Sequence, residues 1–117
     1  MSGKLTTHVL DTAHGKPAAG MLVRLYRMGE SAELLTEKTT NDDGRCDAPI
    51  LDGDAFQPGR YRLTFAVADY FRNAGVDLPE PPFLDIVTID FGITDATTHY
   101  HVPLLAAPYG YSTYRGS

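Results

Sequence analysis

Three histidines and two arginines are the residues of this chain with the clearest capacity for chemistry. His8, His99 and His101 each fall where apolar and polar residues alternate, so each should lie in a β-strand. Because successive side chains of a strand point to opposite faces, His99 and His101 share one face. Imidazoles titrate near neutral pH, and the guanidinium groups of Arg45 and Arg115 can hold an anionic, carbonyl-rich molecule. Together these groups could deprotonate water and orient such a substrate.

Simpler interpretations of the same residues stay open. Any one histidine could be a hydrogen-bonded residue on a polar sheet face, and His99 with His101 could bind zinc. The pair lacks a convincing fourth ligand and any Asp or Glu at matching spacing, so we favour no metal site. Cys46 stands alone, and we expect a buried, inert thiol there. The sequence has no phosphate-binding loop, nucleophile elbow or Cys-X-X-Cys pair, so nucleotide, serine-hydrolase and thiol-redox chemistry lack support.

Two segments in which apolar and polar residues alternate must position the histidines. Residues 5–10 should form a strand that carries His8, and residues 99–106 should form one that carries the other two. Pro103 cannot donate a ladder hydrogen bond, so we expect the second strand to be irregular near its end rather than paired along both edges. A turn of sequence Asn-Asp-Asp-Gly then delivers Arg45 to the start of a further short strand.

The remaining segments indicate an all-β fold with one short helix. Residues 59–68 alternate most clearly, and we expect this strand in the middle of a sheet. Asp69 offers an N-cap for a short helix that ends at Asn73. Seven to eight short strands separated by turns are typical of a two-sheet antiparallel β-sandwich, and residues 1–117 should form a single domain. The predicted strands are 5–10, 21–28, 33–40, 45–48, 59–68, 84–93, 99–106 and 111–114.

Composition restricts the partners and the compartment. The net charge of -5 and the pI near 5.1 give no basic surplus that would attract nucleic acid or an anionic membrane. A single cysteine cannot form an internal disulfide, which fits a reducing compartment. No apolar run has the length of a signal peptide or the roughly 18 residues that span a bilayer. We therefore expect a soluble, cytoplasmic protein.

The last residues are unusual for a chain end. Residues 109–117 are rich in tyrosine and contain neither Lys nor Glu, whereas termini usually carry polar residues and fray. A terminus that buries Tyr111 and Tyr114 beside a fixed Arg115 would suit a binding surface. An edge strand that covers a hydrophobic sheet would explain the same composition equally well.

In these segments the sequence resembles a known family. It is similar to the 5-hydroxyisourate hydrolases of the transthyretin-related family at Thr-Thr-His-Val-Leu-Asp (6–11), Asp-Gly-Arg (43–45), Tyr-His-Val-Pro-Leu-Leu (100–105) and Tyr-Ser-Thr-Tyr-Arg-Gly-Ser (111–117). The resemblance spans the whole chain. The closing Tyr-Arg-Gly-Ser separates these hydrolases from transthyretin, a hormone carrier built on the same sandwich.

This resemblance implies a fold, an assembly and an activity. The fold would be the transthyretin-like sandwich, assembled as a homotetramer, a dimer of dimers with active sites at subunit interfaces. The activity would be the hydrolysis of 5-hydroxyisourate to 2-oxo-4-hydroxy-4-carboxy-5-ureidoimidazoline in urate breakdown, a branch of purine metabolism, without a cofactor. His8, Arg45 and His101 match the catalytic positions of the family. The substrate-binding positions match its terminal motif: Tyr114, Arg115, Gly116 and Ser117.

Two other functions stay open beside the hydrolase. A transthyretin-like carrier of small ligands would not need the terminal motif or the polar His and Arg positions. A zinc-binding or purely structural sandwich would need no catalysis at all. For the hydrolase we expect His101 to activate water with His8 as its partner, and Arg45 with Arg115 to stabilise the oxyanion.

Overall fold

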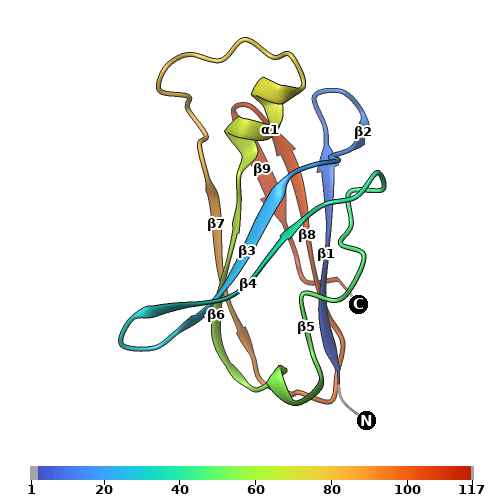
Figure 1. Cartoon of the computed structure of the whole chain (residues 1–117), viewed down its shortest axis with the longest axis vertical. Helices are drawn as coiled ribbons and strands as arrows, with labels where there is room; N and C mark the ends of the chain where they lie inside the picture. Colours follow the sequence, from blue (N-terminus) through green and yellow to red (C-terminus); the bar gives the residue numbers. More distant parts are fainter. Residues whose placement is uncertain (1–2, 117) are drawn as a thin grey trace.

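Two β-sheets packed face to face, with a short helix at one end, make up the computed structural model, which describes residues 3–116 (Figure 1). The strands are β1 (Lys4–Asp11), β2 (Lys16–Pro17), β3 (Leu22–Met28), β4 (Ala32–Thr39), β5 (Leu51–Asp52), β6 (Gly59–Phe65), β7 (Val87–Ile93), β8 (Tyr100–Ala107) and β9 (Gly110–Thr113). The helical segments are the 3-10 turn η1 (Gly53–Ala55) and the helix α1 (Val67–Asn73). Neither helical segment of the described chain has the length and apolar character to cross a membrane. The predicted two-sheet sandwich with one short helix is confirmed, but one of the sheets predicted to be antiparallel is mixed, because β1 and β8 run parallel.

The two sheets differ in how their strands run. One sheet has the order β4-β3-β6-β7, and all its neighbours are antiparallel. The other has the order β2-β1-β8-β9, with β5 also paired to β1. In this second sheet β1 and β8 are parallel, with Thr6 opposite His101 and His8 opposite Pro103. A parallel pair needs a long crossover, and here the whole first sheet and α1 lie between the two strands in sequence.

Every second side chain of these strands points inward and fills the space between the sheets. On β6, Tyr61, Leu63 and Phe65 are fully buried, and β6 lies in the interior of its sheet, as predicted. On β1, Leu5 and Val9 join the same core. Because these odd-numbered residues of β1 face the core, its even-numbered residues face outward.

The expectation that Pro103 excludes β8 from pairing on both edges is wrong. β8 pairs with β1 on one edge and with β9 on the other. The β9 ladder ends where Leu104 lies opposite Thr113, and pairing resumes in the same register between His101 and Gly116. The missing N–H of Pro103 falls in the gap between these pairs, where its carbonyl accepts a hydrogen bond from the Thr113 hydroxyl.

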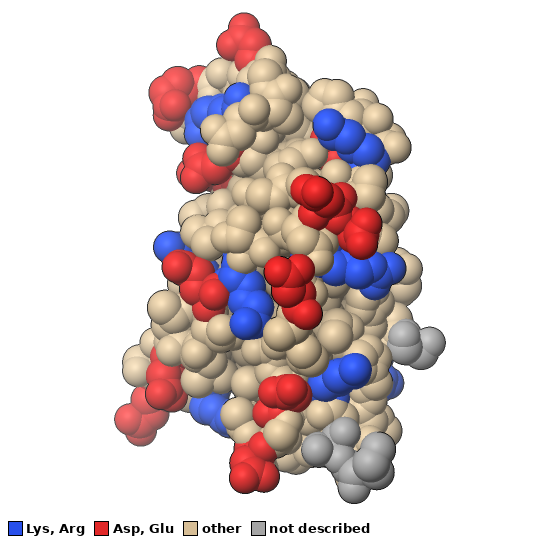
Figure 2. All heavy atoms as spheres, turned by 45° about the vertical axis from the view of Figure 1, so that its right-hand side comes forward, with Lys and Arg blue, Asp and Glu red and all other residues tan. Residues whose placement is uncertain are grey.

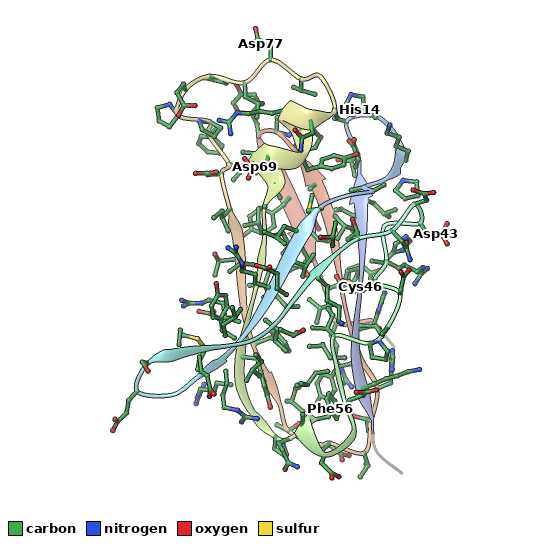
Figure 3. All side chains as sticks on the ribbon, in the orientation of Figure 1. His14, Asp43, Cys46, Phe56, Asp69 and Asp77 are labelled. Atoms are coloured by element: carbon green, nitrogen blue, oxygen red, sulfur yellow. The ribbon has the colours of Figure 1, made fainter. Side chains whose placement is uncertain are left out.

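The boundary between β6 and α1 also differs from the prediction. The strand predicted at 59–68 ends at Phe65, and α1 begins at Val67. Asp69 therefore lies inside the first turn of the helix instead of capping it (Figure 3). The helix starts early because its four buried residues recur at helical spacing and pack onto the core.

A buried carboxylate ties the end of β1 to α1. Asp11 is 1% exposed and accepts hydrogen bonds from the backbone N–H and Nδ1 of His14 and from the Tyr70 hydroxyl. Burial acts to raise the pKa of Asp11, but these hydrogen bonds outweigh it and hold that pKa below its usual value. Burial and the Asp11 carboxylate raise the pKa of Tyr70 to about 12. Through its hydrogen bonds to Asp11, His14 thus stabilises the end of the molecule that carries α1 (Figure 3).

Candidate active site

β1 and β8 place three histidines on the outer face of the mixed sheet. His8 lies within β1, His101 is the second residue of β8, and His99 precedes that strand. All three are partly buried, and the rings of His99 and His101 have centroids 6.4 Å apart with an interplanar angle of 17°. The parallel register sets His101 beside Thr6, two residues before His8. The pairing of distant strands therefore gathers the three rings on one face.

A tight turn brings Arg45 to the same face. The turn predicted at residues 41–44 is confirmed, and it ends at Gly44, which has φ +76°. A Cβ on Gly44 would lie 2.3 Å from the carbonyl oxygen of Val9, so only glycine allows this approach to β1. Arg45 then pairs with His8 in an isolated antiparallel bridge. The short strand predicted at residues 45–48 does not form, and this single bridge at Arg45 stands in its place.

The site opens into two hollows that share His101. The first has a volume of about 500 Å³ and the second about 570 Å³. Charged, polar and apolar residues line the first hollow: Lys4, Thr6, Thr7, Arg45, Cys46, Asp47, Ala48, Pro49, His99 and His101. The second hollow is lined by His101, Tyr114, Arg115 and Gly116. His101 thus stands between the first hollow and residues 114–116.

The surroundings of His101 favour its neutral form. Burial lowers the pKa of His101, and the positive charge of Arg45 lowers it further. A neutral imidazole can accept a proton at pH 7. By contrast, burial raises the pKa of the Cys46 thiol, which favours its protonated form. Cys46 is half-buried in the lining of the first hollow, not fully buried as predicted.

Charge on the surrounding surface is mixed. Figure 2 shows acidic and basic side chains interspersed over the face drawn there. Within the first hollow, positive charge comes from Lys4 and Arg45. Among residues 3–116, no three His, Cys, Asp or Glu side chains gather closely enough to hold a metal ion. The groups offered for chemistry on this face are thus imidazoles, cationic side chains and the carboxylate of Asp47.

The end of the chain folds back against His101. The Gly116 N–H donates to the His101 carbonyl at 2.7 Å. The Arg115 guanidinium lies 4.2 Å from the centre of the Tyr100 ring and donates to the His99 carbonyl. A main-chain hydrogen bond and a cation–π contact therefore fix the tail.

The tyrosines near the end are not buried, contrary to expectation. Tyr111 is 47% exposed and Tyr114 is 61% exposed. The reason is that β9 is the last strand of its sheet and all four of its residues are exposed. Ser117 lies outside the described residues. Of the predicted substrate-binding residues, the structure therefore places Arg115 and Gly116 against the histidine segment and leaves Tyr114 at the rim of the second hollow.

Gly116 has no room for a side chain. A Cβ at this position would lie 2.9 Å from Cδ2 of His101 and 3.3 Å from its Cβ. We expect Gly116→Ala to displace the imidazole and to lower kcat for the reaction proposed below by roughly 10- to 100-fold. Steady-state kinetics measures this loss. Gly29→Ala is the matched control because a Cβ there meets nothing within 4 Å, and equal kcat for both variants would contradict the packing role of Gly116.

Sequence reasoning missed Thr6 and most of the lining of the first hollow. The Thr6 hydroxyl oxygen lies 2.8 Å from Nδ1 of His101 and 3.1 Å from Nε2 of His99. The position of Thr6, two residues before His8 on the same strand face, is the sequence feature that could have identified it. The strand predicted at 45–48 does not form beyond Arg45, and nothing in that prediction placed residues 46–49 beside the histidines.

Comparison with known proteins identifies the family. The model of the HIUase/Transthyretin family matches residues 5–116. The 5-hydroxyisourate hydrolase 2 of Rhizobium meliloti (strain 1021) is 58% identical over 117 residues, which cover 99% of this chain and 98% of that protein. The solved structure of Klebsiella pneumoniae 5-hydroxyisourate hydrolase has a TM-score of 0.82 and 39% identity, covering 98% of this chain and 99% of the other. Sea bream transthyretin in complex with thyroxine has a TM-score of 0.86 at 22% identity, covering 97% and 94%, which is a likeness of fold alone. The chain belongs to the HIUase/Transthyretin family.

Proposed function

We propose that the chain hydrolyses 5-hydroxyisourate to 2-oxo-4-hydroxy-4-carboxy-5-ureidoimidazoline, a step of urate breakdown. Relatives of more than half identical sequence over nearly the full length carry the name of this hydrolase. The structural observation that carries the proposal is the imidazole of His101 in the wall of a cavity of about 500 Å³ that Arg45 also lines, where burial and the charge of Arg45 lower the pKa of His101. A base and a cationic donor in one cavity are what the hydrolysis of a cyclic amide requires.

In this mechanism His101 accepts a proton from water while the water oxygen attacks the ring carbonyl beside the labile nitrogen. The carbonyl oxygen becomes an oxyanion, which the Arg45 guanidinium stabilises. When the carbon–nitrogen bond breaks, its electron pair leaves with the nitrogen. That nitrogen takes the proton held by His101, and the attacked carbon becomes a carboxylic acid, which then releases its own proton to solvent and leaves as a carboxylate. His101 returns to its neutral form, so the cycle consumes only water.

His8 and the terminal motif orient the reactants. His8 donates through Nε2 to the Asp43 carbonyl at 2.9 Å, so the neutral ring keeps Nδ1 as an acceptor that can hold the attacking water. We assign substrate binding to the terminal motif. The Arg115 guanidinium already lies over the Tyr100 ring, so the Arg115 side chain loses less conformational entropy when it binds the ureide group of the substrate. The residues of this motif are Tyr114, Arg115, Gly116 and Ser117.

We also propose that the chain works in the cytoplasm as a homotetramer, a dimer of dimers. Within the described chain β7 and β9 each pair on one side only, and an unpaired strand edge favours association. Apolar side chains, among them Ile89 and Phe91, line a hollow of about 240 Å³ between these edges. A second copy would cover this hollow, and a second dimer would close the open face that carries His101.

An absorbance time course after the enzymatic oxidation of urate tests the activity. Freshly formed 5-hydroxyisourate should decay several-fold faster with the protein than without it, in proportion to protein concentration. A carrier or a purely structural sandwich would bind the substrate or ignore it without accelerating its decay. Decay at the spontaneous rate over a wide range of protein concentrations would remove the hydrolase proposal.

A further inference from the structure

We propose that Thr6 and His99 are positioning residues for His101: the Thr6 hydroxyl accepts the Nδ1 proton of His101 and donates its own proton to Nε2 of His99. This arrangement leaves the lone pair of His101 on Nε2. The geometry stands on two short contacts, 2.8 Å from Thr6 Oγ1 to His101 Nδ1 and 3.1 Å to His99 Nε2. Its catalytic meaning rests on the hydrolase function proposed above.

The Thr6 hydroxyl has one hydrogen and two ring nitrogens to satisfy. It can donate to only one of them, so the other nitrogen must carry a proton and donate to the hydroxyl oxygen. If both nitrogens donated to the oxygen, the Thr6 hydrogen would have no acceptor among the described residues, so two arrangements remain. In one, Thr6 donates to His101, whose proton then sits on Nε2; in the other, His101 donates from Nδ1 and Thr6 donates to His99.

Only the second arrangement suits a ring that must take up and release a proton. With Nδ1–H bonded to Thr6, neutral His101 has a free lone pair on Nε2, and protonation there leaves the hydrogen bond to Thr6 unchanged. In the first arrangement Nε2 already carries a proton, and protonation at Nδ1 would force the hydroxyl to turn. A base held in the wrong tautomer loses most of its activity.

The rest of the ring is held as this role requires. Nδ1 of His101 faces Thr6, and a Cβ on Gly116 would lie 2.9 Å from Cδ2, so the opposite edge of the imidazole leaves no room for a side chain at Gly116. The backbone of His99 is held by Arg115, which donates to its carbonyl at 3.3 Å. These contacts keep the imidazole in place without the Thr6 hydroxyl. Removing that hydroxyl should therefore change the tautomer of His101 more than the orientation of its ring.

Histidine nitrogen NMR reads the tautomer directly and needs no substrate. In the parent protein above the pH at which His101 titrates, we expect its Nδ1 to be protonated and its Nε2 to be unprotonated. Thr6→Val keeps the shape of the side chain but removes the hydroxyl, and it should move a large share of His101 to the Nε2–H tautomer. Thr6→Ser restores the hydroxyl and should restore the parent spectrum. The His101 signals are assigned as those lost in His101→Asn.

Steady-state kinetics of the same variants measures how the tautomer of His101 affects turnover. Thr6→Val should lower kcat by roughly 10- to 100-fold with a much smaller change in KM, and Thr6→Ser should recover most of the loss. His99→Leu removes the acceptor of the Thr6 proton and should act in the same direction. His99→Gln keeps an acceptor oxygen and should lose less. Thr39→Val, the same change at an exposed position of β4 in the other sheet, is the matched control and should keep the parent kcat.

Several results would overturn the proposal. They are a parent His101 with its proton on Nε2, a Thr6→Val variant with an unchanged tautomer, or a Thr6→Val variant with the parent kcat. If the parent protein itself does not accelerate the decay of 5-hydroxyisourate, the hydrolase function falls. In that case the NMR tautomer of His101 alone decides whether Thr6 and His99 position this ring.

Discussion

The His101→Asn variant is expected to fold as the parent does and to hydrolyse 5-hydroxyisourate roughly 10²–10⁴ times more slowly. His101 is only partly buried, and its link to Gly116 is a main-chain hydrogen bond that any residue can make. The asparagine amide can still bond to Thr6, so the sheet should stay intact. It offers no nitrogen that can accept a proton, so the activation of water is lost. Initial rates, corrected for spontaneous decay, measure the effect, and circular dichroism checks the fold.

His14→Asn is the matched control for this change. It makes the same substitution on the hairpin beside α1, far from the two hollows (Figure 3). We expect it to weaken the contact with Asp11 while leaving kcat near that of the parent. A folded His101→Asn protein with parental turnover would show that another group activates the water.

Arg45→Met should lower kcat by roughly 10²–10³-fold, because the donors that stabilise the oxyanion are lost. It should also move the acid limb of the pH–rate profile to higher pH. The active form of His101 is neutral, and the charge of Arg45 helps hold its pKa below the ordinary value of about 6.5. Without that charge the pKa rises, so a larger fraction of His101 is protonated at any given acidic pH. Profiles of kcat/KM against pH report this shift for the free enzyme.

Arg45→Lys separates the two effects of Arg45. Lysine keeps the positive charge but lacks the planar fork of donors, so kcat should still fall while the acid limb stays near its parental position. Arg24→Met, which breaks the pair between Arg24 and Glu37 in the other sheet, should change neither quantity. If the acid limb of Arg45→Met coincides with that of the parent, the charge of Arg45 does not control the proton affinity of His101.

The local parts of the fold could be predicted from the sequence, because they depend on neighbouring residues. Alternation of Tyr61, Leu63 and Phe65 on β6 predicts both its strand and its burial. The turn that ends at Gly44 follows from residues that tolerate positive φ. The helix boundary at Val67 was missed because the same apolar residues fit either the end of a strand or the first turn of a helix.

The non-local parts of the site could not be predicted from periodicity. No local pattern states that β1 pairs with β8, or that the two run in the same direction. Pro103 therefore suggested an irregular strand, because the rule about its missing N–H was applied without knowing that β9 leaves a gap at that position. For the same reason the contact of Thr6 with His99 and His101 was invisible, although strand phase placed Thr6 on the correct face.

The parallel pairing of β1 with β8 has a consequence for biosynthesis. Thr6 and His101 are 95 positions apart, so β1 leaves the ribosome long before β8 is made and must wait to pair with it. During that delay the nascent β1 exposes main-chain groups to wrong partners, including the same segment of other growing chains. Pairing between residues so far apart in the sequence also slows folding. Slow translation or crowded polysomes should therefore favour aggregation through residues 4–11, before the imidazoles have ever met.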